Sequence, residues 1–151
     1  MRTDYLLFQF KTESQAEPLL ASTFQQFCAN QALALTVHRV AFSADQRLNY
    51  CYAKLENPIP IDSLMLRLLQ TAFRAACGHD ARVSRLERAF QGARNPVYES
   101  SQSTQVPQSH YVVETDVEAG WWPEIVRWYD TEHMPGLAGQ VPFAFGFNSR
   151  V

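Results

Sequence analysis

The chain has 151 residues, of which 46% are hydrophobic and 19% are charged, and its formal net charge is -2. This length fits one domain or two very small ones, and this composition excludes an intrinsically disordered protein. The net charge provides no basic footprint for nucleic acid, and no apolar run approaches the roughly 20 residues that span a bilayer.

The N-terminal segment MRTDYLLFQF turns polar after a few apolar residues and has no small-residue cleavage site, so it does not resemble a signal peptide. The three cysteines, Cys28, Cys51 and Cys77, are odd in number and widely spaced. Such cysteines are typical of a reducing compartment. We therefore expect a cytoplasmic protein with neither nucleic acid nor a membrane as a partner.

Residues 4–90 predict six elements in the order βαββαβ, joined by short connections. Alternating apolar residues indicate the strands, and apolar residues at helical spacing indicate the helices. This order is typical of the ferredoxin-like fold, an α+β architecture in which two helices cover one face of an antiparallel sheet. The expected elements are, in chain order, a strand at 4–10, a helix from Ser14 to Asn30, a hairpin of strands at 33–42 and 48–55, a helix from Asp62 to Cys77, and a strand at 81–90.

The second helix has the clearest boundaries. Asp62 is a good N-cap residue, and Gly78 stands where helices commonly end in the left-handed conformation. The preceding segment 56–61 contains Pro58 and Pro60 and is expected to be irregular. The apolar stripe of the helix is expected along Leu64, Leu68, Ala72 and Ala75, widened by Met65, Leu69 and Phe73.

A polar segment with two prolines, Pro96 and Pro107, then interrupts the pattern and indicates a linker. The sequence therefore predicts a ferredoxin-like domain at 1–92, a linker at 93–109 and a further part at 110–151.

The further part repeats the first half of the domain as βαβ. Its expected elements are a strand at 110–117, a helix from Pro123 toward His133 and a strand that begins at Phe143. The two strands of a split βαβ unit are not neighbours, and so small a unit cannot bury enough apolar surface alone. We expect the first domain or a second copy of the chain to complete this sheet.

The segment from Trp121 to Pro135, WWPEIVRWYDTEHMP, combines aromatic and titratable side chains. Its fifteen residues include all three tryptophans of the chain. Aromatic walls with a few polar groups suit a small-molecule pocket.

The run VVETDV…WPEIVRWYDTEHMPGLA resembles a segment of the EthD-like proteins in the dimeric α+β barrel superfamily. Their helix carries the pattern W-Y-D-x-x-H-x-P, which Trp128, Tyr129, Asp130, His133 and Pro135 match. The turn Val-Pro-Gly-Phe of the family is Val-Pro-Phe here, without the glycine. The resemblance implies a ferredoxin-like domain that pairs through its sheet into a homodimeric barrel, with a cleft between sheet and helices. Relatives include cofactor-free monooxygenases, lactone isomerases and polyketide cyclases.

Three residues of this segment are candidate catalytic residues. Asp130 lies three positions before His133 and Tyr129 lies four before it, so both pairs can touch on a helix. In this hypothesis His133 is the general base, Asp130 orients it, and Tyr129 donates a hydrogen bond to an oxyanion formed next to a carbonyl. The alternative is structural, because a cation is favoured in the last turn of a helix and Asp130 can face water.

The candidate substrate-binding residues are Trp121, Trp122, Trp128 and His38. The first two precede the helix and suit a pocket mouth, whereas Trp128 also has the spacing of a core residue. His38 lies on a strand face, where a lone histidine is commonly structural. Tyr50 and Tyr52 share a strand face and could line a cavity or a dimer seam, although such a pair is more commonly structural.

No metal or other cofactor is expected. The four histidines are scattered, and the chain has neither metal-ligand spacing nor a glycine-rich phosphate loop after a strand. Two functions are left open. One is a cofactor-free enzyme, of isomerase, cyclase or monooxygenase type, that acts on a small hydrophobic carbonyl or phenolic compound. The other is a non-catalytic small-ligand-binding or assembly protein of the same fold.

Overall fold

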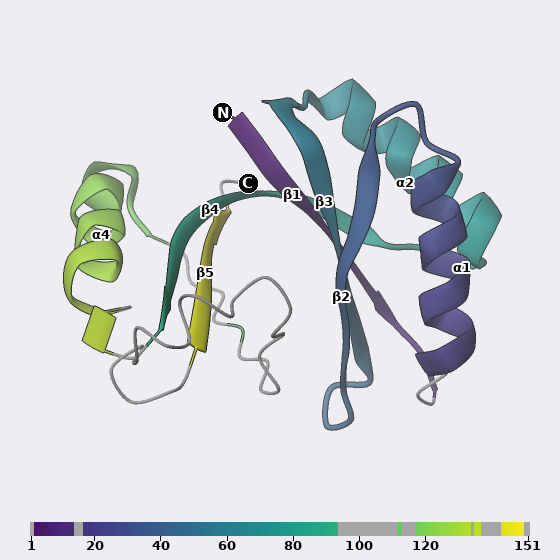
Figure 1. The fold of residues 1–151 in the computed structure, drawn as a ribbon, viewed down its shortest axis with the longest axis horizontal. Helices are drawn as coiled ribbons and strands as arrows, with labels where there is room; N and C mark the ends of the chain where they lie inside the picture. The colour runs from purple at the N-terminus through teal and green to yellow at the C-terminus, as the bar shows by residue number, and fades with distance from the viewer. Residues whose placement is uncertain are drawn as a thin grey trace. The chain divides into compact units, whose positions relative to one another are not determined.

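The computed structural model describes residues 2–13, 17–93, 112, 117–133, 135–136 and 143–149. The chain divides into two compact units. The first comprises Met1–Glu87 with Ser149–Val151, and the second comprises Arg88–Asn148. Figure 1 shows the course of the chain.

The first unit has the predicted order βαββαβ. Its strands are arranged in the order β2-β3-β1-β4, and the pairs β2–β3, β3–β1 and β1–β4 are antiparallel. This α+β architecture is compatible with a ferredoxin-like fold. The elements are β1 (Arg2–Lys11), α1 (Glu17–Ala29), β2 (Leu35–Ser43), β3 (Leu48–Pro60), α2 (Ser63–Cys77) and β4 (Arg82–Ala93), the last of which continues into the second unit.

Both helices of the first unit cover the same face of the strands β1, β2 and β3 (Figure 1). Alternate residues of a strand point to opposite faces, so Phe8 and Phe10 both face the helices. There they meet Phe24 and Phe27 of α1 and Phe73 of α2, with ring centroids 5.0 to 6.1 Å apart. This layer is a packed core, so in the first unit it is not the cleft that the resemblance implies.

Helix α2 begins and ends where the sequence predicts. The side-chain Oδ1 of Asp62 accepts a hydrogen bond from the backbone N–H of Met65 at 2.8 Å. Gly78 has a φ of 75°, and its N–H donates to the carbonyl oxygen of Arg74 at 2.9 Å. A left-handed residue with a C-terminal hydrogen bond is the usual reason for glycine at this position. The expected cap at Ser14 lies outside the described residues.

The apolar stripe predicted for α2 is confirmed in part. Leu69 and Phe73, which were expected to widen the stripe, are buried. Leu64 and Leu68, which were expected along its centre, are 58% and 62% exposed. The members of each pair are four residues apart, so each pair lies along one side of the helix. The two pairs lie on different sides, so a helix that turns one pair toward the sheet turns the other toward the surface.

Replacing Asp62 with alanine is expected to lower the free energy of unfolding by about 1 kcal/mol, because the Met65 N–H loses its acceptor. Urea denaturation followed by far-UV circular dichroism measures this loss. Asp62→Asn keeps a good capping oxygen and is expected to remain within about 0.5 kcal/mol of the natural chain. Equal losses in the two variants would show that the cap does not stabilise α2.

The expectation of an irregular segment at 56–61 is wrong for most of its length, because β3 continues to Pro60. The register shifts between Thr3 and Tyr5 of β1, where β3 has extra residues. Pro58 lies in this bulge, and Pro60 is the last residue of the strand. Prolines are tolerated in strands at such places, because no ladder hydrogen bond requires their missing N–H.

The second unit contains a helical segment and the strand β5 (Phe143–Ser149), which neighbours β4 in the sheet order. The helical segment consists of a short 3-10 turn η1 (Ala119–Trp121), the helix α4 (Trp122–Trp128) and a π-helical turn η2 (Tyr129–His133). Most of the linker expected at 93–109 and of the strand expected at 110–117 lies outside the described residues. Within the described part of the chain, no helix is long and apolar enough to cross a membrane.

Candidate functional site

Three of the predicted site residues come together at the π-helical turn. The rings of Trp128 and His133 stack at a centroid distance of 4.7 Å. The ring of Tyr129 meets the His133 ring edge-on at 4.9 Å and the Trp128 ring at 5.1 Å. The predicted contact between Tyr129 and His133 is therefore present, with Trp128 as a third member.

Asp130 has a different environment. Among the described residues, no hydrogen bond or ion pair joins Asp130 to His133, and the buried Oδ1 of Asp130 has no hydrogen-bond partner. A π-helix closes its hydrogen bonds from residue i to i+5. Each residue then advances by a smaller angle than in an α-helix, so residues four or five apart share a side and residues three apart do not. The π-helical geometry accounts for the contacts of His133 with Tyr129 and Trp128 and not with Asp130.

The tryptophans of this segment lie near the surface. Trp121 is 63% exposed and Trp128 is 44% exposed, while Trp122 is half-buried. No residue of α4 is buried, so the alternative placement of Trp128 as a core residue is wrong. His133 is exposed as well. The aromatic cluster is thus a surface feature of the second unit.

A second group of aromatic and polar side chains lies on the sheet of the first unit, on the face away from α1 and α2. Tyr5, Leu7 and Gln9 alternate along β1 with residues of the core and point to this other face. Tyr52 pairs with Leu7, and Tyr50 pairs with Gln9. All five are at most 7% exposed, although none belongs to the core cluster. We call this group, with Leu86, His38 and Arg39, the second sheet face.

His38 reaches the second sheet face through a bulge. The register of β2 against β3 shifts between Val37 and Arg39, which leaves His38 as the extra residue. Its ring meets the ring of Tyr5 edge-on at a centroid distance of 5.0 Å. Arg39 follows and pairs with Tyr52. His38, the substrate-binding residue predicted on this strand, therefore lies beside Tyr5. It is far along the chain from the predicted tryptophans.

The electrostatics of this face are positive. The pKa of His38 is lowered from its usual value by burial, and further by the charges of Lys54 and Arg39. His38 is therefore expected to be neutral at neutral pH, able to donate from one ring nitrogen and accept at the other. Burial also lowers the pKa of Arg39, and the interaction with Tyr52 opposes this effect. A guanidinium remains charged under such shifts.

This face combines apolar tyrosine rings with polar groups, which are the tyrosine hydroxyls, the Gln9 amide and the His38 imidazole. Each of these residues has an interaction within the chain. The sequence analysis did not single out Tyr5, Gln9 or Arg39. The available signal was the alternation along β1, which places Tyr5 and Gln9 on the other face of the strand from Phe8 and Phe10.

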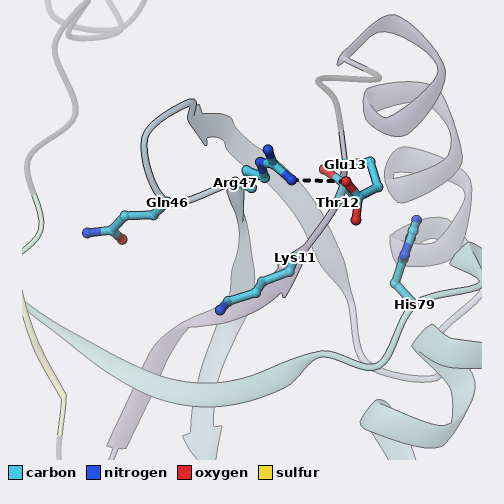
Figure 2. A pocket seen from close by; sticks show the side chains of 6 residues that line it. All are labelled: Lys11, Thr12, Glu13, Gln46, Arg47 and His79. Carbon is cyan, nitrogen blue, oxygen red and sulfur yellow. Dashed lines mark hydrogen bonds and ion pairs between the residues drawn. The ribbon is translucent and has the colours of Figure 1, made fainter.

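A pocket of about 460 Å³ lies at one end of the sheet, where the β2–β3 turn meets the end of β1 (Figure 2). Arg47, in the left-handed conformation with a φ of 52°, reaches Glu13 at 3.0 Å, and Figure 2 shows Gln46 directed away from this pair. Both members of the ion pair are mostly exposed, which makes it weak. The pair and the bond from the Thr12 N–H to the Arg47 carbonyl oxygen tie the turn to β1. These contacts give the residues that line the pocket a structural role. Its lining residues are Lys11, Thr12, Glu13, Gln46, Arg47 and His79.

Within the described ranges, no group of three or more histidine, cysteine, aspartate or glutamate side chains could hold a metal ion. No family model, no curated protein and no solved structure matches this chain.

Proposed function

We propose that this chain is a dimeric α+β barrel protein, related to the EthD-like proteins, that binds a small hydrophobic carbonyl or phenolic compound on the second sheet face. The observation that carries the proposal is the buried row of polar-tipped aromatic side chains that lies outside the core. A tyrosine combines an apolar ring with a hydroxyl group that can donate or accept a hydrogen bond, which suits a ligand of this chemistry.

The barrel and the ligand are linked in this proposal. A ferredoxin-like sheet covered by helices on one face has its other face available for pairing with a second sheet. In the first unit both helices lie on the face opposite to the second sheet face (Figure 1). The proposed partner is the sheet of a second copy of the chain, with the C-terminal βαβ half-repeat as part of the same assembly. In the sheet order, the strand β5 of the half-repeat neighbours β4, which continues from the first unit into the second.

We favour a binding function over a catalytic function for a geometric reason. The catalytic hypothesis requires Asp130 to orient His133, and the described contacts of His133 are the rings of Trp128 and Tyr129. The His133 ring stacks on Trp128, and no hydrogen bond or ion pair with a carboxylate is seen for it among the described residues. The second sheet face, in contrast, already combines a neutral imidazole with several hydroxyl groups.

Titration calorimetry with 2-naphthol and 1-indanone, a phenol and a ketone of suitable size, tests the site. Removing one hydroxyl group with Tyr52→Phe is expected to weaken binding about fivefold, because one hydrogen bond contributes about 1 kcal/mol. The ring and its packing are kept, so the fold is retained.

The matched control is Tyr129→Phe, which removes a tyrosine hydroxyl from the aromatic cluster of the second unit. It is expected to leave both affinities unchanged. If Tyr129→Phe weakens binding and Tyr52→Phe does not, the site lies at the π-helical turn and the proposal is wrong. Failure of both compounds to bind the natural chain also contradicts it.

A further inference from the structure

Four large hydrophobic side chains are exposed among the described residues, and they form two pairs. Leu64 and Leu68 of α2 are 58% and 62% exposed, and Trp121 and Trp128 of the second unit are 63% and 44% exposed. Single apolar residues are normal on a protein surface, whereas larger apolar patches mark sites of interaction.

The outer side of α2 is apolar along its length. Leu64 and Leu68 are four residues apart and lie on one side of the helix, and Ala75, seven residues after Leu68, continues this side and is exposed as well. The inner side packs Leu69 and Phe73 against the sheet. A helix that is apolar on more than one side is typical of a helix that is covered on more than one side. We call Leu64, Leu68 and Ala75 the leucine stripe.

The tryptophans form a second surface of the same kind. Trp121 and Trp128 are seven residues apart, which is about two helical turns, so they lie on one side of the helical segment with about 10 Å between them. Glu124 is exposed between them, three residues after Trp121 and four before Trp128. We call Trp121, Glu124 and Trp128 the tryptophan surface.

The two surfaces lie on segments of opposite charge. Helix α2 contains two arginines, Arg67 and Arg74, and no aspartate or glutamate. Arg74 pairs with Asp80 at 3.1 Å, whereas the exposed Arg67 takes part in no ion pair among the described residues. The segment 117–133 contains four acidic residues and one arginine. Surfaces of opposite charge attract one another and fix the register of a contact.

We infer that the leucine stripe of one copy of the chain docks against the tryptophan surface of a second copy, with Arg67 of the first facing Glu124 of the second. Each copy has both surfaces, so a second copy supplies the complement of each. Docking of two leucine stripes would instead bring together two helices whose only charged residues are arginines, and like charges in an interface are unfavourable.

This contact is separate from the pairing of sheets in the proposed function. Helix α2 lies on the face of the first unit opposite to the second sheet face (Figure 1). The contact between the leucine stripe and the tryptophan surface therefore joins copies of the chain whether or not their sheets are paired.

Sedimentation velocity of the full chain in low salt, from micromolar to millimolar protein concentrations, tests the contact. The average sedimentation coefficient of the natural chain is expected to rise toward the millimolar end. Leu68→Ser and Trp121→Ser are each expected to shift this rise to about tenfold higher concentration, because each removes an apolar side chain that the contact buries. Both side chains are mostly exposed in the single chain, so both variants are expected to keep the fold, which far-UV circular dichroism checks.

Reversal of charge tests the facing of the two surfaces. Arg67→Glu and Glu124→Arg are each expected to weaken the association about fivefold in low salt, because each replaces an attraction by a repulsion. The two substitutions in one chain restore opposite charges, and this double variant is expected to associate within about twofold of the natural chain. The matched control is Arg67→Lys, which keeps the charge and is expected to change the association less than about twofold.

Three results would overturn the inference. The first is a sedimentation coefficient of the natural chain that does not rise with concentration. The second is a weaker association of Leu68→Ser together with an unchanged association of Trp121→Ser, because the leucine stripe would then dock on another surface. The third is a double charge variant that associates as weakly as the single ones. The proposed function is tested by ligand binding, so none of these results decides it.

Discussion

Replacing Phe73 with alanine is expected to lower the free energy of unfolding of the first unit by about 3 to 5 kcal/mol, the largest effect expected of any single substitution considered for this chain. The side chain is 0% exposed and contacts four other phenylalanine rings, at centroid distances of 5.0 to 6.1 Å. Alanine leaves a cavity between the sheet and both helices, which close packing cannot refill without moving the backbone.

Urea denaturation followed by far-UV circular dichroism measures this loss. Tryptophan fluorescence is less suitable, because all three tryptophans lie in the second unit. The control is Leu68→Ala on the same helix, where the side chain is 62% exposed and the expected change is within about 0.5 kcal/mol. Similar losses at the two positions would contradict the assignment of the α2 core face.

Alkaline pH is expected to destabilise the first unit through its buried thiols. Burial, together with the nearby thiols Cys77 and Cys28, raises the pKa of Cys51 from 9.0 to about 12. The pKa of Cys28 is likewise raised to about 12 and that of Cys77 to about 11. The unfolded chain releases these protons near pH 9 and the folded chain does not. Stability is therefore fully present below pH 9 and is lost as the pH rises toward 12.

For Cys51 alone the loss is on the order of 1 kcal/mol at pH 10, and Cys28 adds to it in the same direction. The measurement is the urea midpoint from pH 8 to pH 10 in the presence of a reducing agent. Cys51→Ala is expected to have a lower stability at pH 8 but a shallower decline with pH, since one titrating group is gone. An unchanged slope in Cys51→Ala would refute the explanation.

Local chemistry explains why the sequence predicts the first unit so well. The ends of α2 depend on Asp62 and Gly78. The capping preferences of these residues act within a few positions, so they can be recognised without the rest of the chain. The alternation of Phe8 and Phe10 with Tyr5 and Gln9 likewise indicates a strand from its own pattern. The strand order β2-β3-β1-β4 is compatible with the split βαβ pattern that the order of these elements predicts.

The predictions differ from the structure where contacts between residues far apart in the sequence decide the local conformation. The face of α2 is chosen by its fit against the phenylalanines of β1 and α1, because two apolar pairs compete for the sheet at equal helical spacing. The extension of β3 to Pro60 depends on a bulge against Thr3 and Tyr5, far away in sequence. The sequence of β3 alone reports neither the partner nor the register.

The candidate site is only partly predictable for the same reason. His38 and the pair Tyr50 and Tyr52 stand out in the sequence, but a strand does not reveal which of its faces the helices cover. Only after α1 and α2 are placed on one side does the register assemble Tyr5, Gln9 and Arg39 on the other. The π-helical turn at Tyr129–His133 has no recognised sequence signal, so the loss of the Asp130–His133 contact was not predictable.

The strand β4 crosses the boundary between the two units at Glu87 and Arg88 without interruption. Its alignment is fixed in the first unit, where Val83 lies opposite Phe8 and faces the core. A slip by one residue would turn Val83 to the wrong side and would reverse every later residue of the strand. The alignment of β4, the strand that β5 neighbours, is therefore set by packing inside the first unit.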